Sequence, residues 1–282
     1  MNNSSILPPI DLLKEQSSLR SAIESEELIN AASPLVFPVG TNADGVLTVA
    51  DFRATGHFIS SGHVGSGHAS YDEGAFVLSL LYRYTPDDLK LVLIDPKMVQ
   101  LTPYEGIPHL LAPIVQDPES AERAVSQVLE EMDRRFELFA NAGVNNIDQY
   151  NQAQGKLPYI VIVATEIADL MMVNGSFYEK AFITLSQKAK AVGIHMYLAT
   201  QRPSKDVVTD ILLANIFGRI VFAVASEIDS VRLLNSTGAE KLSSQGALLY
   251  SDLTTKDVVQ LQAPYVSDEE VMKIVEYLKE EA

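Results

Sequence analysis

The sequence predicts an α/β protein with a mostly parallel, twisted sheet and helices on both faces. Short apolar runs rich in β-branched residues alternate along the chain with longer segments of helical periodicity. Strands that alternate with helices form parallel sheets whose two faces are both covered. A chain of 282 residues with 47% hydrophobic content can bury a full core, in one large domain or two small ones.

Composition excludes several classes of protein. The chain has no cysteine, so neither a disulfide framework nor a thiolate metal site is expected. No apolar run approaches the roughly 20 residues that span a bilayer, and the N-terminus lacks the features of a signal peptide. A formal charge of −16 disfavours broad attraction to nucleic acid or anionic membrane. Together these features predict a soluble, cytoplasmic protein.

The elements follow in order from the N-terminus. Residues 1–33 are expected to form a polar lead with a short helix near residues 19–31. Two apolar runs within residues 34–52 flank Asp44-Gly45, which is a strong hairpin signal. A long amphipathic helix is predicted over residues 119–140, with Gly143 placed to end it. Central strands are predicted at 57–61, 89–95, 158–165, 193–200 and 219–225, late edge strands near 246–251 and 257–266, and an acidic amphipathic helix over 267–282.

The segment from Phe58 to Ser70 is the most informative part of the chain. Gly62, Gly65 and Gly67 match the small residues of the phosphate-binding loop G-x-x-x-x-G-K-[ST]. In that loop the lysine contacts the β- and γ-phosphates, and the hydroxyl ligates Mg²⁺. Here His68 and Ala69 occupy those two positions, so both functions are missing. Taken alone, the loop could equally be an ordinary glycine-rich turn between a strand and a helix.

Longer sequence segments point to one protein family. From about Pro34 to the C-terminus the chain resembles the motor domain of the FtsK/SpoIIIE family of DNA translocases. The resemblance is carried by LLYRYTPDDLKLVLIDPKMVQLTPYEGIPHLLAPIV, EMDRRFELFANAGVNNIDQYN, PYIVIVATEIADLMM, QKAKAVGIHMYLATQRPSKDVVT, and ANIFGRIVFAVASEIDS with TGAEKL and GALLYS. It implies a RecA-like P-loop NTPase fold over residues 34–282, with residues 1–33 a reduced remnant of the domain that usually precedes the motor.

The resemblance also assigns site positions. It places the nucleotide-binding Walker A motif at Gly62, His63, Val64, Gly65, Ser66, Gly67, His68 and Ala69. The Walker B strand ends at Thr165-Glu166, where the family carries Asp-Glu, so the Asp that organises Mg²⁺ is replaced by Thr165. Glu166 stands at the position of the glutamate that activates water, and Gln201 at that of a γ-phosphate sensor. Three losses at one site predict an impaired ATPase, because each such loss typically costs a factor of about 10²–10⁵ in rate.

Several assignments remain alternatives. Arg202 and Arg219 match family arginines near a subunit interface, and Lys97 is either functional or a structural ion-pair lysine. The histidines show no metal-ligand spacing, so no metal site of their own is predicted.

The family further implies ATP and Mg²⁺, bound weakly or not at all here, and double-stranded DNA as partner. It also implies a homo-oligomeric, hexameric ring or a mixed ring with an active relative, and a part in chromosome segregation. A pseudo-ATPase acting as ring subunit or regulator is therefore expected. The alternatives are an active ATP-driven translocase with an unusual Walker A motif and a cradle for another phosphate-bearing ligand.

Overall fold

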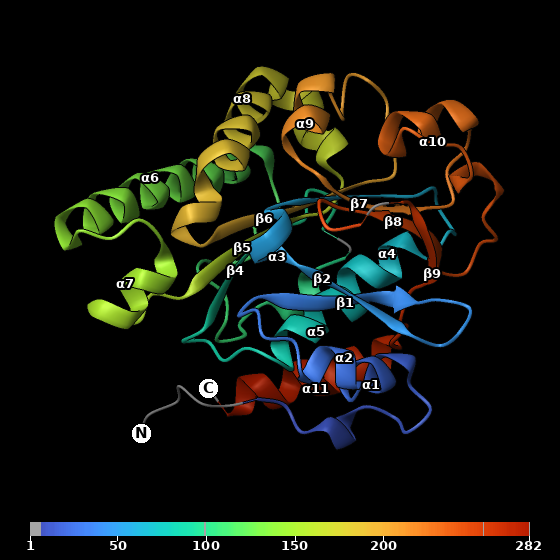
Figure 1. The fold of residues 1–282 in the computed structure, drawn as a ribbon, viewed down its shortest axis with the longest axis horizontal. Coiled ribbons are helices and arrows are strands. Elements are labelled where there is room, and N and C mark those ends of the chain that lie inside the picture. The colour runs from blue at the N-terminus through green and yellow to red at the C-terminus, as the bar shows by residue number, and fades with distance from the viewer. Residues whose placement is uncertain (1–6, 99, 256, 282) are drawn as a thin grey trace.

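The computed structural model describes residues 7–98, 100–255 and 257–281, and its central feature is a single mixed sheet (Figure 1). The order of the strands is β2-β1-β9-β8-β7-β3-β6-β5-β4. Strands β7, β3, β6, β5 and β4 are parallel, whereas β8, β9, β1 and β2 extend the sheet with antiparallel pairings. The strands are β1 (Val36–Thr41), β2 (Leu47–Asp51), β3 (Phe58–Ser61), β4 (Leu89–Ile94), β5 (Tyr159–Ala164), β6 (Ile194–Thr200), β7 (Gly218–Phe222), β8 (Ala247–Ser251) and β9 (Val259–Gln262).

Helices cover both faces of this sheet. In Figure 1, α6, α8, α9 and α10 lie on one side, and α4, α5 and α11 lie on the other. The α-helices are α1 (Ser18–Ile23), α2 (Glu26–Ile29), α3 (Phe52–Thr55), α4 (His68–Ser70), α5 (Val77–Leu81), α6 (Pro118–Ala142), α7 (Ile147–Ala153), α8 (Ile167–Lys188), α9 (Asp210–Asn215), α10 (Glu227–Leu234) and α11 (Asp268–Glu280). A π-helical segment, Tyr71–Phe76, joins α4 to α5, and short 3₁₀ segments lie at Ile10–Leu12, Thr102–Tyr104, Ala189–Val192 and Ala239–Lys241.

The core lies on both faces of the parallel strands, whose residues are almost all buried. Every residue of β5, β6 and β7 is buried, as expected for strands covered from both sides. An aromatic cluster fills the face under α5, where the rings of Phe76 and Tyr197 stack at 3.9 Å between centroids. This packing fixes the helical segment that begins at the glycine loop.

Most predicted elements are confirmed, and one placement is wrong. Helix α6 ends at Gly143, which adopts the left-handed conformation, and α11 begins with a capping box between Ser267 and Glu270. The hairpin turn is held by the Asn42 side chain, which accepts from two backbone amides. The two late strands, however, are not at the edge, because β1 pairs with β9 and places both β8 and β9 inside the sheet.

The N-terminal residues pack against the rest of the chain. The predicted helix near residues 19–31 is split into α1 and α2, because Ser25 caps a new helix. Leu13 and Leu19 are buried in the main core, and the backbone N–H of Lys14 donates to Glu270 at 2.8 Å. The segment around residues 10–14 therefore packs against α11, whereas α2 packs against β1 and β2. The boundary at residue 33 stays a prediction.

Candidate functional site

The glycine loop joins β3 to a helix, as the sequence predicts. Strand β3 ends at Ser61, and α4 begins directly after Gly67, whose φ is 92°. A Cβ atom on Gly67 would lie 2.5 Å from the backbone N of Gly246, so only glycine fits there. Helical turns continue from His68 through the π-helical segment to Leu81. The backbone thus keeps a strand–loop–helix geometry that can receive an anion.

Part of the loop's hydrogen-bonding capacity is used inside the protein. Ser66 is buried, and its hydroxyl oxygen accepts from the His68 amide at 3.3 Å. Its carbonyl accepts from Gly246 at 2.8 Å, and its amide donates to the carbonyl of His63 at 3.1 Å. The His68 amide is therefore not free for a phosphate, whereas the tip of the loop at Val64 is exposed.

The side chain at the lysine position points into the protein. His68 is buried, and its Nε2 lies 2.8 Å from Oδ2 of Asp72, one helical turn further on, in a close contact that lacks aligned hydrogen-bond geometry. The other carboxylate oxygen of Asp72 accepts from Ser60 at 2.9 Å and Tyr197 at 2.5 Å. Asp72 thus gathers donors from β3 and β6 beneath the loop. An imidazolium at position 68 would be paired with Asp72 rather than available to a phosphate.

The hydroxyl at the predicted Walker B position is also bonded within the protein. Thr165 Oγ1 donates to the carbonyl of Ile94 at 3.3 Å and lies 3.5 Å from Oδ1 of Asp95. The other oxygen of Asp95 accepts from the amides of Gln100 and Leu101 at 2.7 and 2.9 Å. The nearby carboxylate of Asp95 is therefore engaged in holding the loop after β4.

Glu166 is the one carboxylate at the end of β5, and three donors hold it. It is buried, with Thr200 Oγ1 donating at 2.7 Å, Lys97 Nζ at 3.2 Å and the Gln201 amide at 3.3 Å. Its φ of 52° is unusual for a residue other than glycine. Lys97 therefore forms an ion pair with Glu166, and the three bonds use most of the hydrogen-bonding capacity of this carboxylate.

The space enclosed by these groups is very small. A cavity of about 10 Å³ lies between the glycine loop and the end of β5, lined by His68, Ala69, Asp72, Glu73, Gln100, Thr165, Glu166, Ala199 and Gln201. A cavity needs roughly 10–15 Å³ to hold one water molecule. Mg²⁺ retains several water ligands at octahedral geometry, so neither the space nor the oxygen donors fit this ion.

Glu73 adds an unusual carboxyl beside this cavity. Burial, together with the negative charges of Asp72, Asp95 and Asp268, raises the pKa of Glu73 to about 8. The side chain therefore retains a proton near neutral pH and adds no charge that could bind a metal ion.

The two predicted arginines do not reach the loop. Arg202 is exposed and pairs with Asp206 at 3.2 Å. Arg219 is buried and donates to three carbonyls of its own chain, those of Leu213, Gly218 and Leu233. The structure thus brings together the loop, Thr165, Glu166 and Gln201, but neither arginine. Their interface roles stay predictions.

The histidines outside the loop are mostly core residues. His57, His109 and His195 are buried; burial lowers the pKa of His57 to about 3, that of His109 to about 4, and that of His195 well below its usual value. Within residues 7–98, 100–255 and 257–281, no three His, Cys, Asp or Glu side chains are grouped so as to hold a metal ion.

Sequence reasoning missed Asp72, Tyr197 and Thr200. The spacing of four residues between His68 and Asp72 was a usable signal, because such pairs meet on a helix. Tyr197 and Thr200 lie on β6, and only the strand order reveals that they stand beside the loop.

Comparison with known proteins adds a family to this geometry. The FtsK/SpoIIIE family profile matches residues 18–157 and 152–205. The chain is 41% identical over 272 residues to DNA translocase FtsK of Bacillus cereus, covering 93% of the chain and 34% of that protein. It is 41% identical to DNA translocase SpoIIIE of Bacillus subtilis with the same coverage, and 42% identical over 267 residues to DNA translocase SftA of that organism, covering 93% and 28%. The chain spans about a third of the length of these relatives.

Solved structures confirm the fold class. The cytoplasmic domain of the type VII secretion ATPase EccC from Thermomonospora curvata superposes with a TM-score of 0.74 at 24% identity, covering 87% of this chain and 31% of that one. The conjugation coupling protein TcpA of pCW3, solved with ATPγS, gives 0.74 at 22% identity, covering 99% and 75%. The predicted α/β fold of the RecA-like P-loop type is thus confirmed. No helix in the described parts of the chain is long and apolar enough to cross a membrane.

Proposed function

The chain belongs to the FtsK/SpoIIIE family, and from this premise we propose that it is a DNA-translocase motor domain whose ATP turnover is lost or strongly reduced. The observation that carries the proposal is the inward pairing of His68 with Asp72. A residue at the lysine position acts on a triphosphate only if its charge faces the phosphates. Here that side chain is buried against a carboxylate of its own helix.

The surroundings of the pair support the same proposal. Ala69 offers no oxygen to Mg²⁺, and the Thr165 hydroxyl is directed to Ile94. Glu166 remains at the position that would activate water, but Thr200, Lys97 and Gln201 already bind it. The residues do not fit a catalytic Mg²⁺ ion. The glycine backbone is expected to retain weak, metal-independent affinity for nucleotide, phosphate or sulfate.

The role we propose is that of a ring subunit or regulator. The family resemblance supports assembly into a hexameric ring around double-stranded DNA, either alone or mixed with an active relative, in the cytoplasm and in chromosome segregation. With 21 basic and 37 acidic residues, the chain alone should bind DNA weakly and with strong salt dependence. Gel-shift titration over a salt series tests this, and sub-micromolar binding at physiological salt contradicts it.

A turnover assay tests the proposal. Phosphate release by the purified protein should stay at background with and without duplex DNA. The variant H68K/A69S/T165D restores the three missing groups and should raise turnover by a factor of about 10² or more. Adding Glu166→Gln to that variant should abolish the gain.

The alternative functions predict other results. DNA-stimulated turnover of the unmodified protein near or above about 1 s⁻¹ favours an active translocase and contradicts our proposal. Tight binding of a phosphate-bearing compound that persists in a chelator, measured by calorimetry, favours a changed ligand instead.

A further inference from the structure

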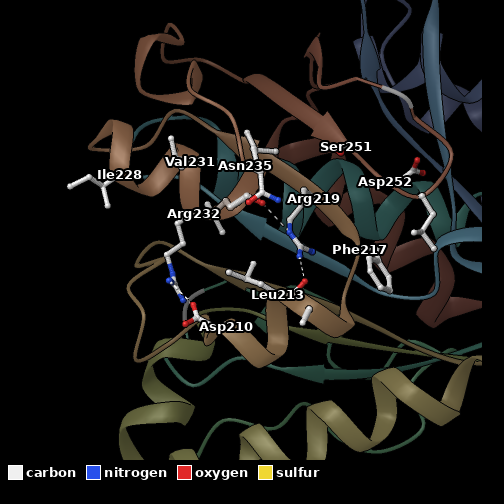
Figure 2. A pocket seen from close by; sticks show the side chains of 14 residues that line it. Asp210, Leu213, Phe217, Arg219, Ile228, Val231, Arg232, Asn235, Ser251 and Asp252 are labelled. Atoms are coloured by element: carbon white, nitrogen blue, oxygen red, sulfur yellow. Dashed lines mark hydrogen bonds and ion pairs between the residues drawn. The ribbon is translucent and has the colours of Figure 1, made fainter.

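A second hollow lies away from the glycine loop. A groove of about 780 Å³ is enclosed by α9, the start of β7, α10 and the end of β8 (Figure 2). Gly218 opens β7 beside Phe58, at the start of β3, whereas the glycine loop follows Ser61 at the other end of β3. The groove therefore reaches the opposite edge of the parallel strands and is independent of the nucleotide site.

Apolar side chains form much of its rim. Ile228 is 78% exposed and Phe217 46% exposed, and Val231 and Leu253 are exposed as well. Figure 2 shows Ile228 and Val231 on α10 at one side of the groove and Phe217 at the other. Bulky apolar side chains gathered around a hollow are typical of surfaces that bind another protein.

The floor of the groove carries a charge without a counter-ion. Arg219 is only 7% exposed, and its guanidinium donates to the carbonyls of Leu233, Gly218 and Leu213 at 3.0, 3.1 and 2.8 Å. In the described part of the chain no carboxylate forms an ion pair with it, and burial lowers its pKa to about 10. These bonds use three of the five N–H donors of a guanidinium, so further donors are available to an acceptor from outside.

The carboxylates that border the groove already have partners within the chain. Asp210 pairs with Lys205 at 2.8 Å and with Arg232 at 3.0 Å. Asp252 accepts from the hydroxyls of Thr55 and Tyr250 at 3.0 and 2.5 Å. Their negative charges disfavour a nucleic-acid backbone, whereas Arg219 favours one carboxylate seated deep in the groove.

We propose that this groove binds a short peptide segment of a partner protein in which a bulky apolar side chain stands next to an Asp or Glu. The apolar side chain packs between α10 and Phe217, and the carboxylate pairs with Arg219. A buried apolar anchor beside a buried charge pair is the usual energetic centre of a peptide interface.

Selection of peptides from a random library tests this. Phage-displayed random dodecapeptides are selected on the unmodified protein, and recovered sequences are measured as fluorescein-labelled peptides by anisotropy. We expect a consensus that pairs an apolar residue with Asp or Glu. Ile228→Lys should weaken binding by about tenfold or more, whereas Val46→Lys, at a half-exposed hairpin position, should change it by less than about twofold.

A double-mutant cycle that combines Arg219→Met with a change in the peptide tests the role of the peptide's carboxylate. Changing the peptide's acid to its amide should weaken binding to the unmodified protein about tenfold, and this loss should disappear on Arg219→Met. If Arg219→Met fails to fold, as judged by circular dichroism, the Ile228→Lys comparison decides. The proposal is overturned if no consensus emerges, if the consensus lacks an acid, or if Ile228→Lys binds the peptides unchanged. Displacement of the labelled peptides by a short unlabelled DNA duplex would also overturn it, since the groove would then bind nucleic acid.

Discussion

The glycine loop and the groove under α10 differ in the partners that they give to a buried charged side chain. Beneath the loop, Asp72 meets His68, Ser60 and Tyr197, all supplied by its own chain. In the groove, the hydrogen-bond acceptors that the described residues offer to Arg219 are backbone carbonyls. The cavity between the loop and the end of β5 measures about 10 Å³, and a separate hollow of about 390 Å³ is lined by Gly65 and Gly67 of the same loop. The groove measures about 780 Å³.

At the glycine loop, side chains of the protein itself bond to the buried charged group. In the groove, the buried charged group has no ionic partner among the described residues. When side chains of the chain occupy the positions of ligand contacts, affinity for the ligand falls, because those bonds must break before it binds. When a buried charge has no partner, a complementary group from another molecule gains the full ionic contact. The comparison predicts that the loop region contributes mainly to stability and the groove mainly to binding.

Removing Asp72 should produce the largest change in stability. In Asp72→Ala, Ser60 and Tyr197 lose their acceptor and His68 loses its partner, all in a buried region. Breaking a buried pair from one side typically costs about 3–5 kcal/mol. Urea unfolding followed by circular dichroism measures the loss. Asp206→Ala removes an exposed carboxylate paired with Arg202 and should leave the unfolding midpoint unchanged. Equal midpoints for the two variants would show that the loop is not held by Asp72.

Removing Arg219 should cost less. Arg219→Met leaves carbonyls without a donor but no carboxylate without a partner. We expect a loss of about 1–3 kcal/mol in the free energy of unfolding, below that of Asp72→Ala. The same urea titration gives the comparison. A loss larger than that of Asp72→Ala would mean that Arg219 is mainly structural, and the contrast between the two regions would fail.

A third expected effect is a pH dependence of stability that arises from Glu73 in the loop region. The pKa of Glu73 is raised to about 8, so the folded protein holds a proton that the unfolded chain releases above pH 4.5. This contribution to stability is present below pH 4.5 and is lost as pH rises through 8. Glu73→Gln should therefore match the unmodified protein near pH 4.5 and exceed it increasingly up to pH 8. Thermal melting over a pH series measures the difference.

Two internal controls accompany this series. Glu276→Gln changes an exposed carboxylate on α11 and serves as the surface control. His57 and His109 have lowered pKa values, so the unfolded chain binds more protons below pH 6.5 and stability falls as pH decreases toward 4. That acid loss is common to all variants and cancels in the comparison. A pH-independent difference for Glu73→Gln would contradict the raised pKa.

The fold was largely predictable because its strands are recognisable in the sequence as short apolar runs. The position of the glycine loop between β3 and a helix was predictable. The sequence also shows that His68, Ala69 and Thr165 stand where the family motifs carry Lys, Ser or Thr, and Asp, and the effect of these differences on catalysis stays a prediction. The sequence could not show that His68 points inward, since that depends on Tyr197 and Ser60, which reach Asp72 only through the strand order. The burial of Arg219 was equally hidden, because its acceptors are backbone carbonyls, which every residue carries. The edge position of β8 and β9 was predicted wrongly because pairing with β1 leaves no trace in local periodicity.

The contact between β1 and β9 also implies a delay during synthesis between the appearance of β1 and that of its partner strand. Thr41 pairs with Gln262, which follows it by 262 − 41 = 221 residues. Ribosomes extend chains at about 5–20 residues per second, so the first hairpin waits roughly 10–45 s for its neighbouring strand. During that interval one edge of β1 exposes unpaired backbone groups that can pair with another nascent chain. Crowded polysomes, and slow translation of the 3′ half of the message, should therefore lower the yield of folded protein, because they prolong or exploit the exposure of β1.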